Sequence, residues 1–372
     1  MTKRWLGDVI VLGGGPAGSA LATLLARRGH RVLLAAQPPG IRWRPAEIVA
    51  PHTRRLLRQQ KLSDPFDLES TALCSGVEGL WSGAVDFFDY ELMACEPGLA
   101  ISRNAFDSEL VRHAVIAGAE VQSGKTVNAY QKLDGAWTLR LSGPSGELVS
   151  EAPLLVDAVG RSAHSVGLRS QRTYYDRLVA LVCRLPTGSC SKADLLLEAT
   201  ANGWWYVTRA ADGEAAAAFL TDADLLQESG LPRDEVFRTE FAETRIVQHR
   251  LPPLPPELRL FGCDARTGKR DRIAVQGRIA IGDAAYSVDP LSGAGIQRCV
   301  ETAACAAAEC DSFLAGDEKA LERYSVWANK DFNRWLTYRN EVYAAADIDG
   351  PVGAFWRRRN AVGFAGDRLR GK

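Results

Sequence analysis

A glycine-rich turn near the start of the chain constrains the fold more than any other feature. The apolar run Val9–Leu12 is followed by Gly13-Gly14-Gly15-Pro16-Ala17-Gly18 and then by an Ala- and Leu-rich stretch through Arg28. Gly29 stands where such a helix usually ends, and a second apolar run covers residues 31–36. A buried strand, a helix and another buried strand predict a βαβ unit, and therefore an α/β fold with a parallel sheet.

The spacing Gly13-x-Gly15-x-x-Gly18 predicts a dinucleotide-binding site at this turn. Gly13 permits the tight turn, Gly15 lets the backbone approach the phosphates, and Gly18 lets the helix lie close to the strand. The helix that opens at Pro16 and Ala17 directs its N-terminus at the pyrophosphate. The motif is specific because it follows a buried strand and opens a helix.

One expected part of this site is missing from the sequence. The second strand of such a unit usually ends in Asp or Glu, which binds the adenosine ribose hydroxyls. Here Ala36 occupies that position and Gln37 follows it, so an amide is present but no carboxylate. A charged hydrogen bond contributes about 1.5–3 kcal/mol, so we expect weaker cofactor binding than in relatives. NADP specificity is the alternative explanation, although no Arg follows immediately.

Charge and composition exclude several classes of function. Lys+Arg and Asp+Glu both number 45, so the chain lacks the basic excess of a nucleic-acid binder. The run Arg357-Arg358-Arg359 is interpreted as a solvated helix end. The eight cysteines contain no CxxC pair and the five histidines lack metal-ligand spacing, so we expect no metal site. Scattered thiols and the lack of a long apolar run predict a cytoplasmic protein without a membrane span. The oligomeric state stays open.

Two later motifs identify the cofactor through a family resemblance. Residues 278–285 form an apolar run that ends in Gly282-Asp283, and Pro290-Leu291-Ser292-Gly293-Ala294-Gly295-Ile296 leads into an Ala-rich helix. Together with Leu155-Val156-Asp157-Ala158-Val159-Gly160-Arg161, these motifs resemble the superfamily of flavoprotein hydroxylases and geranylgeranyl reductases.

The resemblance implies that the cofactor is FAD. In that family the Gly-Asp aspartate, here Asp283, binds the ribityl chain, and the helix after the second Gly-rich turn points its N-terminus at the flavin pyrimidine. A helix N-terminus stabilises the negative charge that reduction builds there. The residues that the resemblance assigns to FAD in these motifs are Asp157, Gly160, Gly282, Asp283, Pro290, Gly293, Gly295 and Ile296.

The resemblance also implies residues beside the flavin ring. Arg103 matches the family's flavin-contacting arginine in the run Ile101–Asp107. Glu47 matches a Gly-Glu-x-x-x-Pro loop next to the isoalloxazine, although Ala46 replaces the family's glycine. We take Glu47 and the nearby His52 as the candidate catalytic residues.

The family implies a discontinuous two-domain architecture. A Rossmann-like FAD-binding domain is expected over residues 1–75, 101–170 and 263–330. A substrate domain with a mostly antiparallel sheet is expected over residues 76–100 and 171–262, because that region holds strand-like segments and a breaker-rich run of prolines. Residues 331–372 are expected to form a helical C-terminal tail.

A narrower resemblance concerns the substrate. Four segments are similar to flavoproteins that help build tryptophylquinone cofactors, relatives of the tryptophan halogenases: residues 176–181, 203–206, 219–224 and 353–359. The halogenase Trp-x-Trp-x-Ile-Pro segment is absent and no lysine follows the Glu47 loop, which disfavours halogenation.

The resemblance therefore implies a monooxygenase. NAD(P)H or another donor would reduce the FAD, oxygen would add at flavin C4a as a hydroperoxide, and an aromatic ring, that of a peptidyl tryptophan, would be hydroxylated. Trp204, Trp205 and Tyr206 are the expected substrate wall. Two alternatives stay open: a reductase or dehydrogenase of a small molecule, and a FAD-containing maturation partner that mainly binds an immature enzyme.

Overall fold

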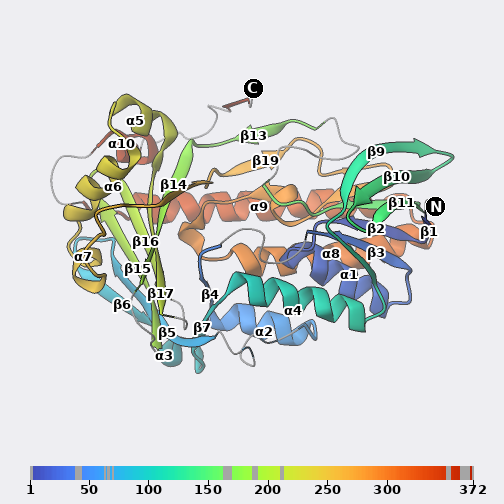
Figure 1. The fold of residues 1–372 in the computed structure, drawn as a ribbon, viewed down its shortest axis with the longest axis horizontal. Helices are drawn as coiled ribbons and strands as arrows, with labels where there is room; N and C mark the ends of the chain where they lie inside the picture. Colours follow the sequence, from blue (N-terminus) through green and yellow to red (C-terminus); the bar gives the residue numbers. More distant parts are fainter. Residues whose placement is uncertain are drawn as a thin grey trace.

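The fold is seen in a computed structural model, which describes residues 3–37, 44–62, 64, 68, 71–161, 170–186, 192–209, 213–348, 353–360 and 369–370. In Figure 1 a large sheet stands on the left, a parallel sheet lies on the right, and the long helix α9 (Ala320–Ala344) runs between them. Among the described residues, no helix is both long enough and apolar enough to cross a membrane.

The parallel sheet confirms the predicted α/β fold. Its strand order is β20-β21-β12-β2-β3-β8, and every neighbouring pair except β20 with β21 is parallel. The strands are β2 (Val9–Leu12), β3 (Val32–Ala36), β8 (Glu120–Ser123), β12 (Leu154–Asp157), β20 (Ala274–Val275) and β21 (Arg278–Ala280). The central strands are buried throughout, which explains their continuous apolar sequence.

Two different layers cover the parallel sheet. One face packs against α1 (Pro16–Arg27), α4 (Arg103–Ile116) and α8 (Gly295–Leu314) in the main apolar core. The other face packs against a sheet with strand order β1-β11-β10-β9. The strands of this second sheet are β1 (Lys3–Leu6), β9 (Thr126–Leu133), β10 (Ala136–Gly143) and β11 (Gly146–Ala152).

The large sheet has the strand order β18-β14-β17-β16-β15-β5-β7-β4, and β6 pairs with β5 beside that path. Its strands are β4 (Glu47–Val49), β5 (Ala72–Leu80), β6 (Val85–Asp89), β7 (Gly98–Ile101), β14 (Leu178–Pro186), β15 (Lys192–Thr200), β16 (Gly203–Arg209), β17 (Glu214–Asp222) and β18 (Leu260–Asp264). All its pairings are antiparallel except β15 with β5.

Helices cover both faces of the large sheet. The outer face packs under α6 (Arg233–Ala242) and α7 (Val247–Arg250), with α5 (Ala223–Glu228) beside them. The inner face packs against the C-terminal part of α9 and against α10 (Ala354–Asn360). Two shorter helices, α2 (Pro51–Gln59) and α3 (Tyr90–Ala94), lie near the β4–β7 end. The sheet β22-β19-β13-β23 comprises β13 (Arg172–Tyr174), β19 (Gly268–Arg270), β22 (Tyr286–Ser287) and β23 (Leu369–Arg370).

Two details differ from the sequence interpretation. Strands β4 and β7, with the start of β5, pair within the large sheet, although the sequence division put residues 47–49 and 72–75 with the FAD-binding domain. The boundaries between the domains stay a prediction. The interpretation of Arg357-Arg358-Arg359 as a solvated end is wrong for Arg359: its side chain is buried and pairs with Asp222 at 2.8 Å, because α10 packs onto the inner face of the large sheet.

Candidate functional site

The first glycine turn has the geometry that a pyrophosphate needs. Gly13 has φ +112°, and a Cβ there would lie 2.3 Å from the Ala158 carbonyl oxygen. A Cβ on Gly18 would lie 1.9 Å from the Gly13 carbonyl oxygen, so only glycine allows this close approach. A Cβ on Gly15 would meet no atom within 4 Å, and no side chain caps α1 at Gly15. Open space therefore faces the uncapped N–H groups of α1, as anion binding at a helix N-terminus requires.

The end of β3 faces this turn. A Cβ on Gly14 would lie 2.5 Å from the Ala36 Cβ, so the side chain at position 36 points at the glycine turn. Gln37 turns elsewhere, and its Nε2 donates to the Lys125 carbonyl oxygen at 3.4 Å. The position where a ribose-binding carboxylate is expected is therefore held by a methyl group.

Asp283 lies beside the first turn. A Cβ on its neighbour Gly282 would lie 2.8 Å from the Ala17 Cβ, which brings the two motifs together. The Asp283 carboxylate pairs with Arg161 and Arg298, each at 3.2 Å, and its side chain is 25% exposed. Burial alone would raise the pKa of Asp283, but the guanidiniums of Arg161, Arg298 and Arg172 outweigh burial, so the pKa is lowered and the carboxylate stays charged.

Sequence reasoning missed Arg172 and Arg298. Arg172 donates to the Asp283 carbonyl oxygen at 2.7 Å and to Ser287 Oγ at 3.0 Å. Its Nε and Nη1, and Nε of Arg298, are buried without a hydrogen-bond partner in the described part of the chain. Buried donors without partners are costly, so these nitrogens fit the presence of an oxygen-rich group such as FAD. The position of Arg298 in the first turn of α8 was the available signal; nothing local marks Arg172.

The second Gly-rich turn opens α8. Pro290–Ser292 form a 3₁₀ turn, and Gly293 follows with φ +59°. A Cβ on Gly293 or on Gly295 would meet nothing within 4 Å, and no side chain caps α8, while Ile296 is buried in its first turn. The second turn thus shares two features with the first: open space beside the glycines and a helix N-terminus without a side-chain cap. A site for the flavin pyrimidine edge is expected to have both.

The structure gives Asp157 and Gly160 different surroundings. Asp157 is buried at the end of β12 and pairs with the buried Arg278 at 2.8 Å, so its carboxylate is part of a structural ion pair. Gly160 has φ +73°, and the turn it allows brings the next residue, Arg161, to Asp283.

Glu47 and Arg103 meet at the start of α4. Arg103 Nη1 donates to Glu47 Oε1, and Nε and Nη2 each lie 3.2 Å from the Asp107 carboxylate. Burial alone would lower the pKa of Arg103, but the two carboxylates raise it. Burial, with Asp283 nearby, raises the pKa of Cys299 in α8 to about 12.

His52 connects α2 to α8. Its Nε2 contacts Gln297 Oε1, and Gln297 Nε2 donates to Glu301 at 2.7 Å. Gln297, which sequence reasoning missed, is thus the link between His52 and the helix whose N-terminus forms the second turn.

The three aromatic residues of β16 do not share one face. Tyr206 is on the inner face, where burial raises the pKa of its hydroxyl and Glu47 and Tyr90 raise it further. Trp204 is also on this face, fully buried, and its Nε1 donates to the Tyr343 hydroxyl at 3.1 Å. Trp205 points outward and is fully buried against Phe237. Neighbouring residues of a strand point to opposite faces of the sheet. Of the three residues expected to form a substrate wall, only Trp204 and Tyr206 therefore share the inner face.

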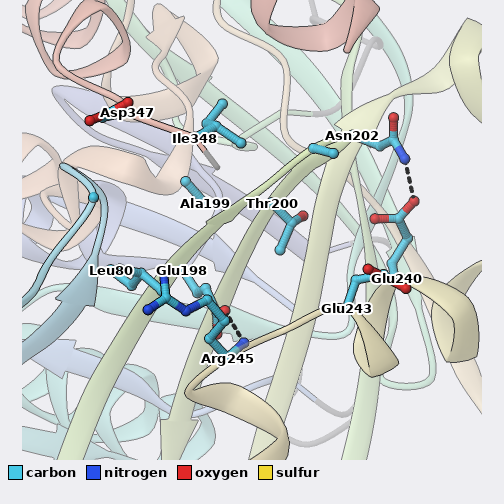
Figure 2. Close-up of a pocket in the computed structure, with 12 residues that line it drawn as sticks. Leu80, Glu198, Ala199, Thr200, Asn202, Glu240, Glu243, Arg245, Asp347 and Ile348 are labelled. Carbon is cyan, nitrogen blue, oxygen red and sulfur yellow. Dashed lines mark hydrogen bonds between the residues drawn. The ribbon is translucent and has the colours of Figure 1, made fainter. Parts of the chain in front are cut away.

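A pocket of about 130 Å³ lies at the end of the β15–β16 hairpin, between the end of α6 with the loop after it (Glu240, Glu243 and Arg245) and the segment after α9 (Asp347 and Ile348) (Figure 2). Glu198 accepts backbone N–H groups of Ile246 at 3.0 Å and Val247 at 2.9 Å, and Glu240 accepts from Asn202 at 2.8 Å. These carboxylates hold loops together, and the glycine turns do not line this pocket.

Comparisons with known proteins agree with this geometry. The model of a family described as FAD binding domain matches residues 7–327. The chain is 27% identical over 368 residues to LodB of Marinomonas mediterranea, named as a FAD-dependent oxidoreductase, covering 95% of this chain and 97% of LodB.

Solved structures share the fold. The myxobacterial chondrochloren halogenase CndH superposes with a TM-score of 0.84 at 21% identity, covering 96% of this chain and 87% of CndH. The peptidyl tryptophan dihydroxylase QhpG superposes with a TM-score of 0.79 at 24% identity, covering 96% of this chain and 79% of QhpG. The glycine turns, the charged Asp283 and the uncapped helices α1 and α8 accord with these comparisons: the chain belongs to the FAD binding domain family and is a FAD-dependent oxidoreductase.

Proposed function

We propose that the protein is a FAD-dependent monooxygenase that hydroxylates a tryptophan side chain within a polypeptide, as a step in building a tryptophylquinone cofactor. The observation that carries the proposal is the aromatic cluster on the inner face of the large sheet, where Tyr206 packs with the buried Tyr90 and where Leu291 of the second glycine turn also packs. Likeness to a peptidyl tryptophan dihydroxylase over 96% of the chain supports this substrate class.

Each group of residues has a separate task in this proposal. The N–H groups at the start of α1 hold the FAD pyrophosphate, Asp283 binds ribityl hydroxyls, and the N-terminus of α8 stabilises negative charge on the flavin pyrimidine. Bound FAD supplies the activation of oxygen. The pair Glu47–Arg103 fixes the β4 loop against α4, and His52 holds α2 to α8 through Gln297.

The substrate ring is held by the tyrosine side of the site. Tyr206 and Tyr90 offer aromatic edges to an indole, and aromatic pairs contribute about 0.5–1.5 kcal/mol beyond area burial. Thr208 Oγ1 donates to the Ala46 carbonyl oxygen at 2.9 Å, which joins β16 to the Glu47 loop. NAD(P)H or a donor of similar chemistry supplies two electrons. One oxygen atom of O₂ then replaces a ring hydrogen as hydroxyl, and the other leaves as water.

The test is mass spectrometry of a tryptophan-containing peptide after incubation with FAD-loaded enzyme, reductant and ¹⁸O₂. We expect one labelled oxygen per hydroxylation. We expect at least about tenfold slower labelling in Glu47→Gln, because the change removes the charge that pairs with Arg103 and positions the β4 loop. Glu120→Gln, an exposed change on β8, is the control and should label at the wild-type rate. Consumption of reductant with turnover of a free small molecule, and no label in any peptide, would identify a reductase and overturn the proposal.

A further inference from the structure

The segment β6–α3 carries large apolar side chains that nothing in the described chain covers. Val85, Phe87 and Phe88 are each 51% exposed, Met93 is 64% exposed and Leu92 is 80% exposed. We call this surface the 85–93 patch. On β6, Val85 and Phe87 point to one face and Phe88 to the other, since neighbouring residues of a strand alternate. Exposed apolar side chains that lie close together mark interaction sites more often than ordinary surface.

The patch includes an open sheet edge. Strand β6 pairs antiparallel with β5, from Gly76 opposite Asp89 to Leu80 opposite Val85. In the described part of the chain no strand pairs with the other edge of β6. An exposed, apolar strand edge is a template for a further strand, and many domains bind extended peptides in this way.

A row of aromatic rings joins the patch to the candidate active site. The Phe88 ring lies 5.9 Å from the Tyr90 ring in an edge-to-face contact. Tyr90 is buried in the same apolar cluster as Tyr206, whose hydroxyl is close enough to Glu47 to be influenced by its charge. A polypeptide on the patch would therefore lie next to the tyrosine side of the site.

Charge indicates what kind of polypeptide fits. Residues 81–95 contain three acidic side chains, Asp86, Asp89 and Glu91, and no Lys or Arg. The pocket of Figure 2 reaches the turn before β6, because Leu80 and Gly83 line it. Its charged lining residues are four carboxylates and one cation: Glu198, Glu240, Glu243, Asp347 and Arg245. Complementary charge favours a partner with basic residues.

We propose that the 85–93 patch is the docking surface for the polypeptide that carries the substrate tryptophan, and that a lysine- or arginine-bearing segment of it adds to β6 as an extra strand. The inference rests on the proposed function for the identity of the occupant. Docking itself is measured separately from chemistry.

The experiment uses FAD-loaded full-length protein and fluorescent peptides of about 12 residues, enough to span the strand, with one tryptophan and lysine or glutamate flanks. We expect the lysine-flanked peptide to bind, and Phe87→Ser and Leu92→Ser each to raise its Kd by at least about tenfold, or about 1.4 kcal/mol. The matched control is Ile116→Ser on α4, where the native side chain is 65% exposed, and it should leave Kd unchanged. In an added strand only every second amide N–H points at β6. Two peptides that are N-methylated on alternate sets of amides should therefore differ: one should lose binding and the other should keep it.

Each contrary outcome has a distinct meaning. Unchanged Kd in both patch variants, or no binding to the wild type, overturns the docking surface, even where ¹⁸O labelling upholds the proposed function. Binding that depends on the patch without any labelling upholds the docking surface and overturns the function. If the glutamate-flanked peptide binds with the same Kd as the lysine-flanked peptide, the proposal that the partner segment is basic is wrong. A wild-type dimer that both patch variants dissolve assigns the patch to a second copy of this chain and overturns the inference.

Discussion

Ala36 is the residue at which this chain departs most clearly from dinucleotide-binding units. Its Cβ faces Gly14, so a carboxylate introduced there would reach toward the glycine turn. We expect Ala36→Glu to tighten FAD binding by about tenfold or more, because a charged hydrogen bond to ribose hydroxyls contributes about 1.5–3 kcal/mol. Titration of apoprotein with FAD, followed by flavin fluorescence, measures the change.

Gln37→Glu is the control for this variant. The Gln37 side chain is directed at the Lys125 carbonyl oxygen and not at the turn, so its carboxylate should leave FAD affinity at the wild-type value. Equal tightening in both variants would point to a general charge effect and contradict the placement of the ribose beside position 36.

Asp283 and Asp224 make a matched pair for testing the second motif. Each carboxylate is paired with two arginines, and their side chains are 25% and 21% exposed. The pKa of each is lowered, so both are charged at neutral pH. We expect Asp283→Ala to lose most of its FAD in gel filtration, measured by absorbance, and Asp224→Ala to retain it. Similar flavin content in the two proteins would remove Asp283 from the cofactor site.

Asp289 would be a poor comparison for Asp283, although both carboxylates follow the same strand in the sequence. Asp289 is buried, caps the 3₁₀ turn at Leu291 N and pairs with Arg339 at 2.9 Å. The sequence predicts only Asp283 at the strand end, but it gives no sign of the partner of Asp289, because Arg339 lies 50 residues away in the chain. The alternation of side chains along a strand is enough to predict that Trp204 and Trp205 point to opposite faces of the sheet. Only the tertiary structure shows which of these faces is the inner one.

At the scale of elements, the sequence predicted those whose pattern is local. The β2–α1–β3 unit follows from continuous apolar runs and glycine punctuation, and the strand-like segments within residues 171–262 correspond to β14, β16 and β17. Strands β5 and β15 were not predicted as partners. β5 contains Ser75, Gly76 and Gly79, and it pairs in parallel with β15 more than a hundred residues later, with a register shift between Ala193 and Leu195. Long-range pairing of this kind leaves no local signal.

Helix α10 supplies a stability prediction at this scale. Arg359 is buried and forms an ion pair with Asp222, and its guanidinium lies 3.5 Å from the Phe355 ring centroid. We expect Arg359→Met to lower the free energy of unfolding by about 3 kcal/mol, the low end for a broken buried pair, because Arg358 still reaches Asp222. Urea denaturation measures it.

The neighbouring Arg357 is exposed and serves as the control, since Arg357→Met should change the unfolding free energy by less than about 0.5 kcal/mol. A small effect of Arg359→Met as well would mean that α10 contributes little to the stability of the large sheet.

At the scale of the whole molecule, α9 connects the large sheet to the cofactor site. Arg339 is buried and lies 2.9 Å from both Asp176 and Asp289. Asp176 accepts the backbone N–H of Leu178 at the start of β14, and Asp289 caps the turn that opens the second glycine motif. One guanidinium thus holds a strand of the large sheet and the second glycine turn in a fixed relation. We therefore expect FAD binding to depend on Arg339, although it is far from the glycine motifs in sequence.

Arg339→Met tests this connection. Removing the guanidinium leaves two buried carboxylates without their cation, so we expect a loss of about 3–5 kcal/mol in unfolding free energy together with weaker FAD binding. Burial already raises the pKa of Asp176 despite Arg339, and the variant should raise it further. A carboxyl group whose pKa is raised in the folded state destabilises the fold at neutral pH, where it is charged, and no longer does so once it is protonated. The loss of unfolding free energy relative to wild type should therefore shrink as pH falls from about 7 to about 5.

Arg323→Met is the matched control on the same helix. Arg323 also has two carboxylate partners, Glu309 and Asp317, but its side chain is 47% exposed, so the change should lower the unfolding free energy by less than about 1 kcal/mol at either pH. Urea titrations with flavin fluorescence at both pH values measure the unfolding free energy, its change with pH and the FAD affinity. A pH-independent deficit in Arg339→Met would show that Asp176 does not depend on Arg339 for its charge.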